Sequence, residues 1–151
     1  MNTNDIKITD DTNIIQSWND SYSLGIELID KQHAGFFGLF DKIKTLRRED
    51  GTFDDLKDSI ADLEKYTNAH FRTEEALLIK SNFAETESHI LQHQLFKKKI
   101  EEFKIAEAYK NTELIDQIIV FMRKWFLMHI AEIDRKYAED VKRHLIEKKL
   151  K

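Results

Sequence analysis

Apolar residues recur every three or four positions over most of this chain, in runs long enough to predict amphipathic helices. The runs cover about 27–47, 53–80, 85–109 and 113–131, and a helical tail follows from about 134 to the end. In the first run the stripe reads Ile26, Ile29, His33, Phe36, Phe37, Phe40 and Ile43. Short polar connections between long helices favour antiparallel neighbours, so the pattern predicts an all-α, antiparallel, up-down-up-down four-helix bundle.

Polar breaks between the runs predict the turns and the division of the chain. In the segment REDGT, Gly51 is the predicted stop of the first helix and Thr52 the predicted cap of the second. Residues 1–22 are polar with isolated apolar positions, and they predict an N-terminal arm whose Trp18 end lies against the domain. We therefore expect an arm over 1–22, the bundle over 23–137 and a C-terminal helical tail over 138–151.

Composition narrows the class of protein. A chain of 151 residues fits one domain with its own core, and the absence of proline agrees with long helices. The chain has no cysteine, which excludes disulfides, thiolate metal sites and a cysteine nucleophile. The net charge is only −4, with acids and bases interleaved, so nucleic acid is not a predicted partner. No signal peptide and no apolar run of about 18 residues is evident, so we predict a cytoplasmic protein with no membrane partner; no protein partner is indicated.

The histidines carry the candidate chemistry. There are six of them, and any one alone is most often a hydrogen-bonded core or surface residue. Five lie on the apolar stripes of four different helices, at similar distances from the turns, and so at one level of an antiparallel bundle: His33, His70, His89, His93 and His129. Glu74, one helical turn after His70, falls at the same level.

A dry core cannot hold five imidazoles and a carboxylate without something positive among them. Imidazole and carboxylate ligands suit iron, manganese, copper or zinc, and at least six ligands at one level indicate two metal ions. Glu74 could bridge them, and a second bridging carboxylate could come from Glu132 or Asp134. Asp134 lies five residues after His129, about 140° around an ideal helix, so its use would require a bulge, an overwound turn or a helix end there.

Four segments together resemble the hemerythrin family, of the stand-alone bacterial type. They are IDKQH at 29–33, HFRTEE at 70–75, HILQH at 89–93 and WFLMHIAEID at 125–134, preceded by Trp18 and YSLGI at 22–26. The resemblance implies a non-haem di-iron site with an oxo or hydroxo bridge. It implies one iron held by His89, His93 and His129, another held by His33 and His70, and bridges from Glu74 and Asp134. The second iron would keep an open position for dioxygen.

The resemblance also implies a dioxygen pocket lined by Phe36, Phe71, Phe126 and Ile130. Relatives commonly have leucine where this chain has Phe126, and we expect the larger ring to slow entry to the pocket or to limit oxidation of the site. Before the third helix the family often has Tyr-Pro, where this chain has Asn82 and Phe83, a departure that concerns the turn.

Reversible dioxygen binding, for carriage, storage or buffering, is the function that this resemblance implies, without enzymatic activity. The alternatives are a di-iron enzyme or redox sensor acting on peroxide or nitric oxide, an iron-buffering protein, and a metal-free interaction bundle. Three neighbours of the site carry further expectations. We expect Glu75 to be a solvated surface acid and Trp125 to be core packing; Asp30 could orient His33 or serve the helix dipole.

Overall fold

The computed structural model describes Trp18 and residues 20–150, and the regular structure of these residues is helical throughout. The first three long helices are α2 (Glu27–Arg48), α3 (Phe53–Lys80) and α4 (Thr86–Ala108). The fourth begins as α5 (Leu114–Trp125) and continues through the π-helical segment η2 (Phe126–Ile133) and the 3₁₀ turn η3 (Asp134–Tyr137) into α6 (Ala138–Leu150). A short 3₁₀ turn, η1 (Asp20–Tyr22), precedes α2.

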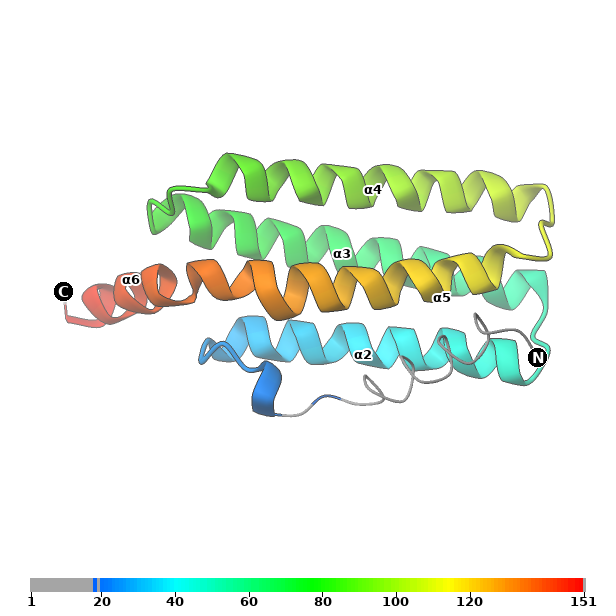
Figure 1. The fold of residues 1–151 in the computed structure, drawn as a ribbon, viewed down its shortest axis with the longest axis horizontal. Helices are drawn as coiled ribbons and strands as arrows, with labels where there is room; N and C mark the ends of the chain where they lie inside the picture. The colour runs from blue at the N-terminus through cyan, green and yellow to red at the C-terminus, as the bar shows by residue number, and fades with distance from the viewer. Residues whose placement is uncertain (1–17, 19, 151) are drawn as a thin grey trace.

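The four long helices run antiparallel to their neighbours in the chain, and α6 extends past the others at one end (Figure 1). Helix α2 packs against α3 and α5, and α4 packs against the same two helices, so the bundle closes around one core. This confirms the predicted all-α four-helix bundle. None of the helices in the described part of the chain combines the length and the apolar character needed to cross a bilayer.

The three turns between the long helices use the same device. A non-glycine residue with positive φ follows each helix: Asp50 at 51°, Asn82 at 53° and Lys110 at 57°. The backbone N–H of the next residue then donates to a carbonyl of the last helical turn, as in Gly51 to Leu46 at 2.9 Å. The left-handed residue of the first turn is thus Asp50, one position before the predicted stop at Gly51.

Helix α3 begins where the sequence predicts, at a reciprocal cap. The hydroxyl of Thr52 accepts from the Asp55 N–H, and the Asp55 carboxylate accepts from the Thr52 N–H, both at 3.1 Å. These two bonds satisfy backbone donors that an isolated helix start leaves unpaired.

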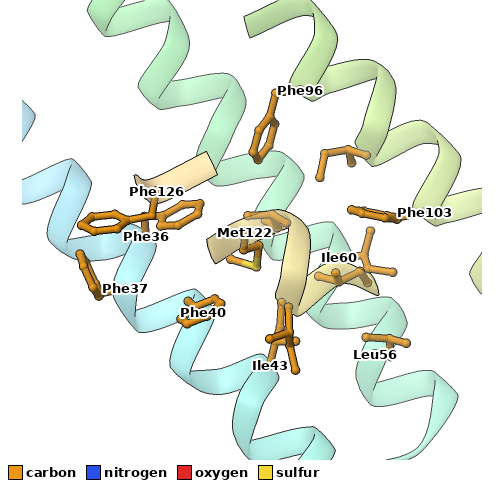
Figure 2. Packing of buried hydrophobic residues seen from close by; sticks show 14 of the residues in the cluster. Phe36, Phe37, Phe40, Ile43, Leu56, Ile60, Phe96, Phe103, Met122 and Phe126 are labelled. Atoms are coloured by element: carbon orange, nitrogen blue, oxygen red, sulfur yellow. The ribbon is translucent and has the colours of Figure 1, made fainter. Parts of the chain in front are cut away.

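Two apolar clusters fill the interior at different levels. The larger one is rich in phenylalanine and occupies the bundle centre, where Phe36 and Phe126 lie together (Figure 2). The smaller one joins the start of α2 and the end of α3 to α6, and it includes Ile29, Leu78 and Tyr137. Along α2, His33 lies between Ile29 of the smaller cluster and Phe36 of the larger one, so the histidine level separates the two clusters.

The described end of the N-terminal arm lies against the bundle, as expected. The Trp18 ring meets the Phe37 ring edge-on, with 6.0 Å between the ring centroids, and the Tyr22 ring stacks on the Phe37 ring with 5.7 Å between the centroids. The rest of the predicted arm, residues 1–17 and 19, lies outside the described residues.

Candidate metal centre

Seven buried polar side chains converge between the two apolar clusters. Helix α2 contributes His33, α3 contributes His70 and Glu74, α4 contributes His89 and His93, η2 contributes His129, and η3 contributes Asp134. All of them are buried, and all were expected at this level of the bundle.

Glu74 divides its two oxygens between two sets of imidazoles. On one side, Oε1 lies 2.5 Å from His89 Nε2, 3.0 Å from His93 Nε2 and 3.9 Å from His129 Nε2. These three rings come from α4 and η2 and surround one position.

The other oxygen, Oε2, faces the rings of α2 and α3. It lies 3.2 Å from His70 Nε2 and 3.9 Å from His33 Nε2. It also accepts a hydrogen bond of 2.9 Å from the Tyr137 hydroxyl. Glu74 therefore stands between a set of three imidazoles and a set of two.

Asp134 makes the same division from the fourth helix. Its Oδ1 lies 3.1 Å from both His89 Nε2 and His129 Nε2, and its Oδ2 lies 3.0 Å from His33 Nε2. Two carboxylates from different helices thus span the same two positions. Glu132, the alternative in the sequence, is exposed and belongs to neither set.

The donor atoms fit two metal ions. They form two groups, in each of which the donor atoms all lie within 4.8 Å of one another: Glu74 with His89, His93 and His129, and His33, His70, Glu74 and Asp134. Within the described part of the chain, His33 Nε2, His129 Nε2 and both Asp134 oxygens are buried without a hydrogen-bond partner. Buried polar atoms of this kind require a partner, and a cation satisfies imidazole and carboxylate lone pairs together.

The π-helical segment explains how His129 and Asp134 meet. The backbone N–H of Asp134 donates to the carbonyl of His129, five residues earlier, instead of four. The wider turn carries Asp134 back over His129 and removes the angular offset that an ideal helix would impose. Of the alternatives that the sequence left open, the described structure has the bulged one.

When no metal is bound, electrostatic interactions between the imidazoles and the two carboxylates stabilise the same arrangement. Burial disfavours the charged form of His33, but the neighbouring carboxylates of Asp134 and Glu74 outweigh it and raise the pKa of His33 to about 9. The balance is the same at His89, whose pKa also rises to about 9. Burial opposes ionisation of Glu74, yet the imidazoles, His70 foremost, hold the pKa of Glu74 well below its usual range.

Comparison with known proteins identifies this arrangement. The sequence profile of the Hemerythrin HHE cation binding domain matches residues 24–141, most of the chain. The chain belongs to the hemerythrin family. It is 32% identical over 126 residues to a bacteriohemerythrin of Clostridium acetobutylicum, a match that covers 81% of this chain and 98% of that protein.

Two further relatives agree with this membership of the hemerythrin family. A bacteriohemerythrin of Stenotrophomonas maltophilia is 25% identical over 130 residues, covering 85% of this chain and 82% of the relative. A myohemerythrin of Riftia pachyptila is 29% identical over 120 residues, covering 80% of this chain and 88% of the relative.

In this hemerythrin-family chain, three imidazole rings are also contacted at Nδ1, the outer nitrogen that points away from the two carboxylates. The rings are those of His70, His129 and His93. Nδ1 of His70 lies 2.6 Å from Gln32 Oε1, and Nδ1 of His129 lies 2.9 Å from Gln92 Oε1. Because an amide oxygen only accepts, both rings carry their proton on Nδ1 and present Nε2 to the carboxylates. The helical pattern of the sequence did not predict a role for either glutamine.

The expectation for Glu75 was wrong. Its carboxylate lies 2.9 Å from His93 Nδ1, and its side chain is 24% exposed. Glu75 does point away from Glu74, but the direction it takes is towards α4, which packs alongside α3. It holds the His93 ring from outside the centre.

The structure also assigns the other two neighbours of the site. Asp30 accepts from the Ser23 hydroxyl at 2.6 Å and from the Leu24 N–H at 2.8 Å, so it fastens the start of α2. Trp125 packs on the core as expected, and its ring also stacks on His129 at 4.0 Å.

Aromatic rings cover the centre on the side of the larger cluster. Phe71 stacks on His93 at 3.8 Å, and Phe126 meets Phe37 at 4.5 Å and Tyr22 at 4.8 Å. Phe36 and Ile130 belong to the same buried cluster. All four residues of the predicted dioxygen pocket are therefore buried in the cluster next to the histidine level.

Proposed function

We propose that this chain binds dioxygen reversibly at a di-iron centre, for carriage, storage or buffering. Membership of the hemerythrin family supports the class of activity. The observation that carries the proposal is the unequal division of imidazoles, three and two, around two buried carboxylates that face both sets.

In the proposed centre, the chain's own residues hold both ions. His89, His93 and His129 hold one iron, His33 and His70 hold the other, and Glu74 and Asp134 bridge them. When bound, the iron pair supplies the electrons that dioxygen binding requires. The position with two imidazoles has one protein donor fewer than the other, so it is the one that can accept an outside ligand.

The remaining residues position the ligands of the proposed centre and shield it from water. Tyr137 donates to Glu74 Oε2 and restricts that carboxylate to one orientation. The apolar residues Phe36, Phe71, Phe126 and Ile130 form the proposed pocket, which excludes water and offers no acidic group to a bound molecule. Such a lining favours release of dioxygen over its further reduction.

The test is anaerobic iron loading of the full chain, followed by addition and removal of dioxygen, watched by visible absorption. We expect two irons per chain and an absorption band that comes and goes with dioxygen over repeated cycles. A band that forms once and decays would contradict reversible binding and favour the alternative, chemistry on peroxide or nitric oxide.

The ligand assignment has its own test. Glu74→Ala should abolish binding of the iron pair, because both positions lose a donor, while the far-ultraviolet circular dichroism stays helical. Asp58→Ala, at an exposed acid on the same helix, is the matched control and should keep two irons. Two irons retained by Glu74→Ala would overturn the assignment.

The cytoplasmic location stays a prediction from the sequence.

A further inference from the structure

Helix α4 carries a second apolar stripe, which the bundle does not use. Its buried face consists of His89, His93, Phe96, Ile100, Phe103 and Glu107. On the opposite face, Leu91 is 56% exposed, Leu95 59% and Ile105 61%, and Tyr109, which caps the end of the helix, is 83% exposed. Helix α4 lies at an outer edge of the bundle, with no described element over this face (Figure 1). Large apolar residues gathered on one open helix face mark an interaction surface.

The spacing of this outer face is that of a coiled-coil seam. Its positions alternate steps of four and three residues: Leu91, Leu95, Lys98, Glu102, Ile105 and Tyr109. The four apolar residues occupy the two ends, and one base and one acid occupy the middle. We call these six residues the outer stripe.

We propose that the outer stripe binds the outer stripe of a second copy of this chain, with the two α4 helices antiparallel about a twofold axis at the level of residue 100. In that register the positions pair off symmetrically. Leu91 meets Tyr109 of the second copy, and Leu95 meets Ile105 of the second copy. A twofold interface requires this kind of self-complementarity, in which each contact occurs twice.

Charge fixes the register. At the centre, Lys98 meets Glu102 of the second copy, and the symmetry makes a second identical pair. A shift by one heptad would lose these pairs and place each charge against an apolar or aromatic residue, and a parallel arrangement would place like charges opposite one another. Charged residues at seam positions specify register and orientation at a cost in affinity.

Contacts within each chain keep the association weak. Glu102 already lies 3.2 Å from Lys99, and Glu101 lies 3.2 Å from Lys104. Beside the twofold axis, Lys99 would face Lys99 of the second copy on one flank, and Glu101 would face Glu101 of the second copy on the other. Both contacts place like charges together. We therefore expect a dimer that forms reversibly with rising concentration, as small transient interfaces do.

The experiment is sedimentation equilibrium of the full iron-loaded chain, with charge variants at the two central positions. Lys98→Glu alone and Glu102→Lys alone each place like charges opposite one another, and each should weaken self-association at least tenfold. An equimolar mixture of the two variants restores opposite charges at both pairs and should form a heterodimer. The double variant K98E/E102K should again form a homodimer.

Lys97→Glu is the matched control, because it makes the same charge change one residue away and off the outer stripe; it should dimerise like the unaltered chain. Thermal unfolding and iron content check that each variant is folded and loaded. A monomer at all concentrations, or single variants that associate unchanged, would overturn the proposal; the former would leave a different protein as the occupant of the outer stripe. A mixture that fails to associate would exclude the antiparallel register. None of these outcomes depends on dioxygen binding.

Discussion

The imidazoles of the candidate centre are oriented from two sides. Inner nitrogens face Glu74 and Asp134, and the outer nitrogens of three rings face side chains of a neighbouring helix, as His93 faces Glu75. A ring held at both nitrogens loses little freedom when a metal binds, because its tautomer and orientation are already set. The outer contacts therefore contribute to metal affinity without touching metal.

Glu75→Gln tests this contribution. The substitution keeps the size of the side chain but removes the negative charge that lies 2.9 Å from His93 Nδ1 and orients the ring. We expect iron to be held 10–100-fold more weakly. The measurement is iron release to a competing chelator. Glu87→Gln, at an exposed acid on α4, should leave the release unchanged; equal release from both variants would contradict a role for Glu75.

The sequence predicted six of the seven converging side chains because each falls on a buried stripe whose period is that of a helix. Asp134 does not follow that period, and only the resemblance to the hemerythrin family favoured it over Glu132. It could not predict their outer partners in the same way. Gln32 and Gln92 each lie one residue before a buried histidine, and Glu75 lies one residue after Glu74. A neighbour in sequence points sideways, and whether it meets solvent or another helix depends on how helices pack. Polar residues directly beside buried histidines are the signal that was available.

Among the elements, α2, α3 and α4 begin and end close to their predicted limits, because caps and turn residues mark them in the sequence. The fourth helix differs. Its predicted end, at about residue 131, falls inside η2. No residue type in the sequence marks this π-helical segment, which forms because His129 and Asp134 both point to the centre. Tertiary structure decides local geometry there, and periodicity alone could not.

Amide hydrogen exchange should distinguish η2 from α5. A π-helical segment is rare and is maintained by its surroundings, so its amides should open more readily than those of a regular helix. We expect faster exchange at residues 126–134 than at 114–125 in the metal-free chain. Iron loading should slow exchange at 126–134, since His129 and Asp134 would then be tied to the same centre. Uniform exchange along both segments, with no effect of iron, would contradict this.

In the molecule as a whole, the centre is a charged layer between two apolar clusters. Without metal, protonated imidazoles and ionised carboxylates hold this layer together. Burial and the charge of Glu74 oppose ionisation of Asp134, but His129 and His33 outweigh both and lower the pKa of Asp134. With metal, the same imidazoles must be neutral to donate their lone pairs. The stability of the metal-free chain and the stability that bound iron adds should therefore change in opposite directions with pH.

Metal-free protein should be most stable between about pH 4.5 and 6.5. The pKa values of His33 and His89 rise from 6.5 to about 9 on folding, so their contribution is complete below pH 6.5 and is lost as pH rises to about 9. The pKa of Glu74 falls from 4.5 on folding, so its contribution is lost as pH falls below that value. The free energy of unfolding by urea, measured across this range, checks both limbs.

Iron-loaded protein provides the comparison for that measurement. Protons compete with iron for the imidazoles, so the stability that iron adds should shrink as pH falls from 9 to 6.5, where the metal-free chain gains stability. Parallel curves for the two forms would show that the imidazoles are not the groups that exchange protons for metal.

The π-helical segment has a consequence for how the chain is compared with others. Buried positions before it, such as Ile118 and Met122, and those after it, such as Tyr137 and Val141, fit one α-helical repeat only when one residue between them is left out. The fourth helix therefore behaves as an ideal bundle helix with a one-residue insertion. An alignment against a bundle that lacks this segment needs a gap there; without it, every later position is assigned to a face about 100° away from its own.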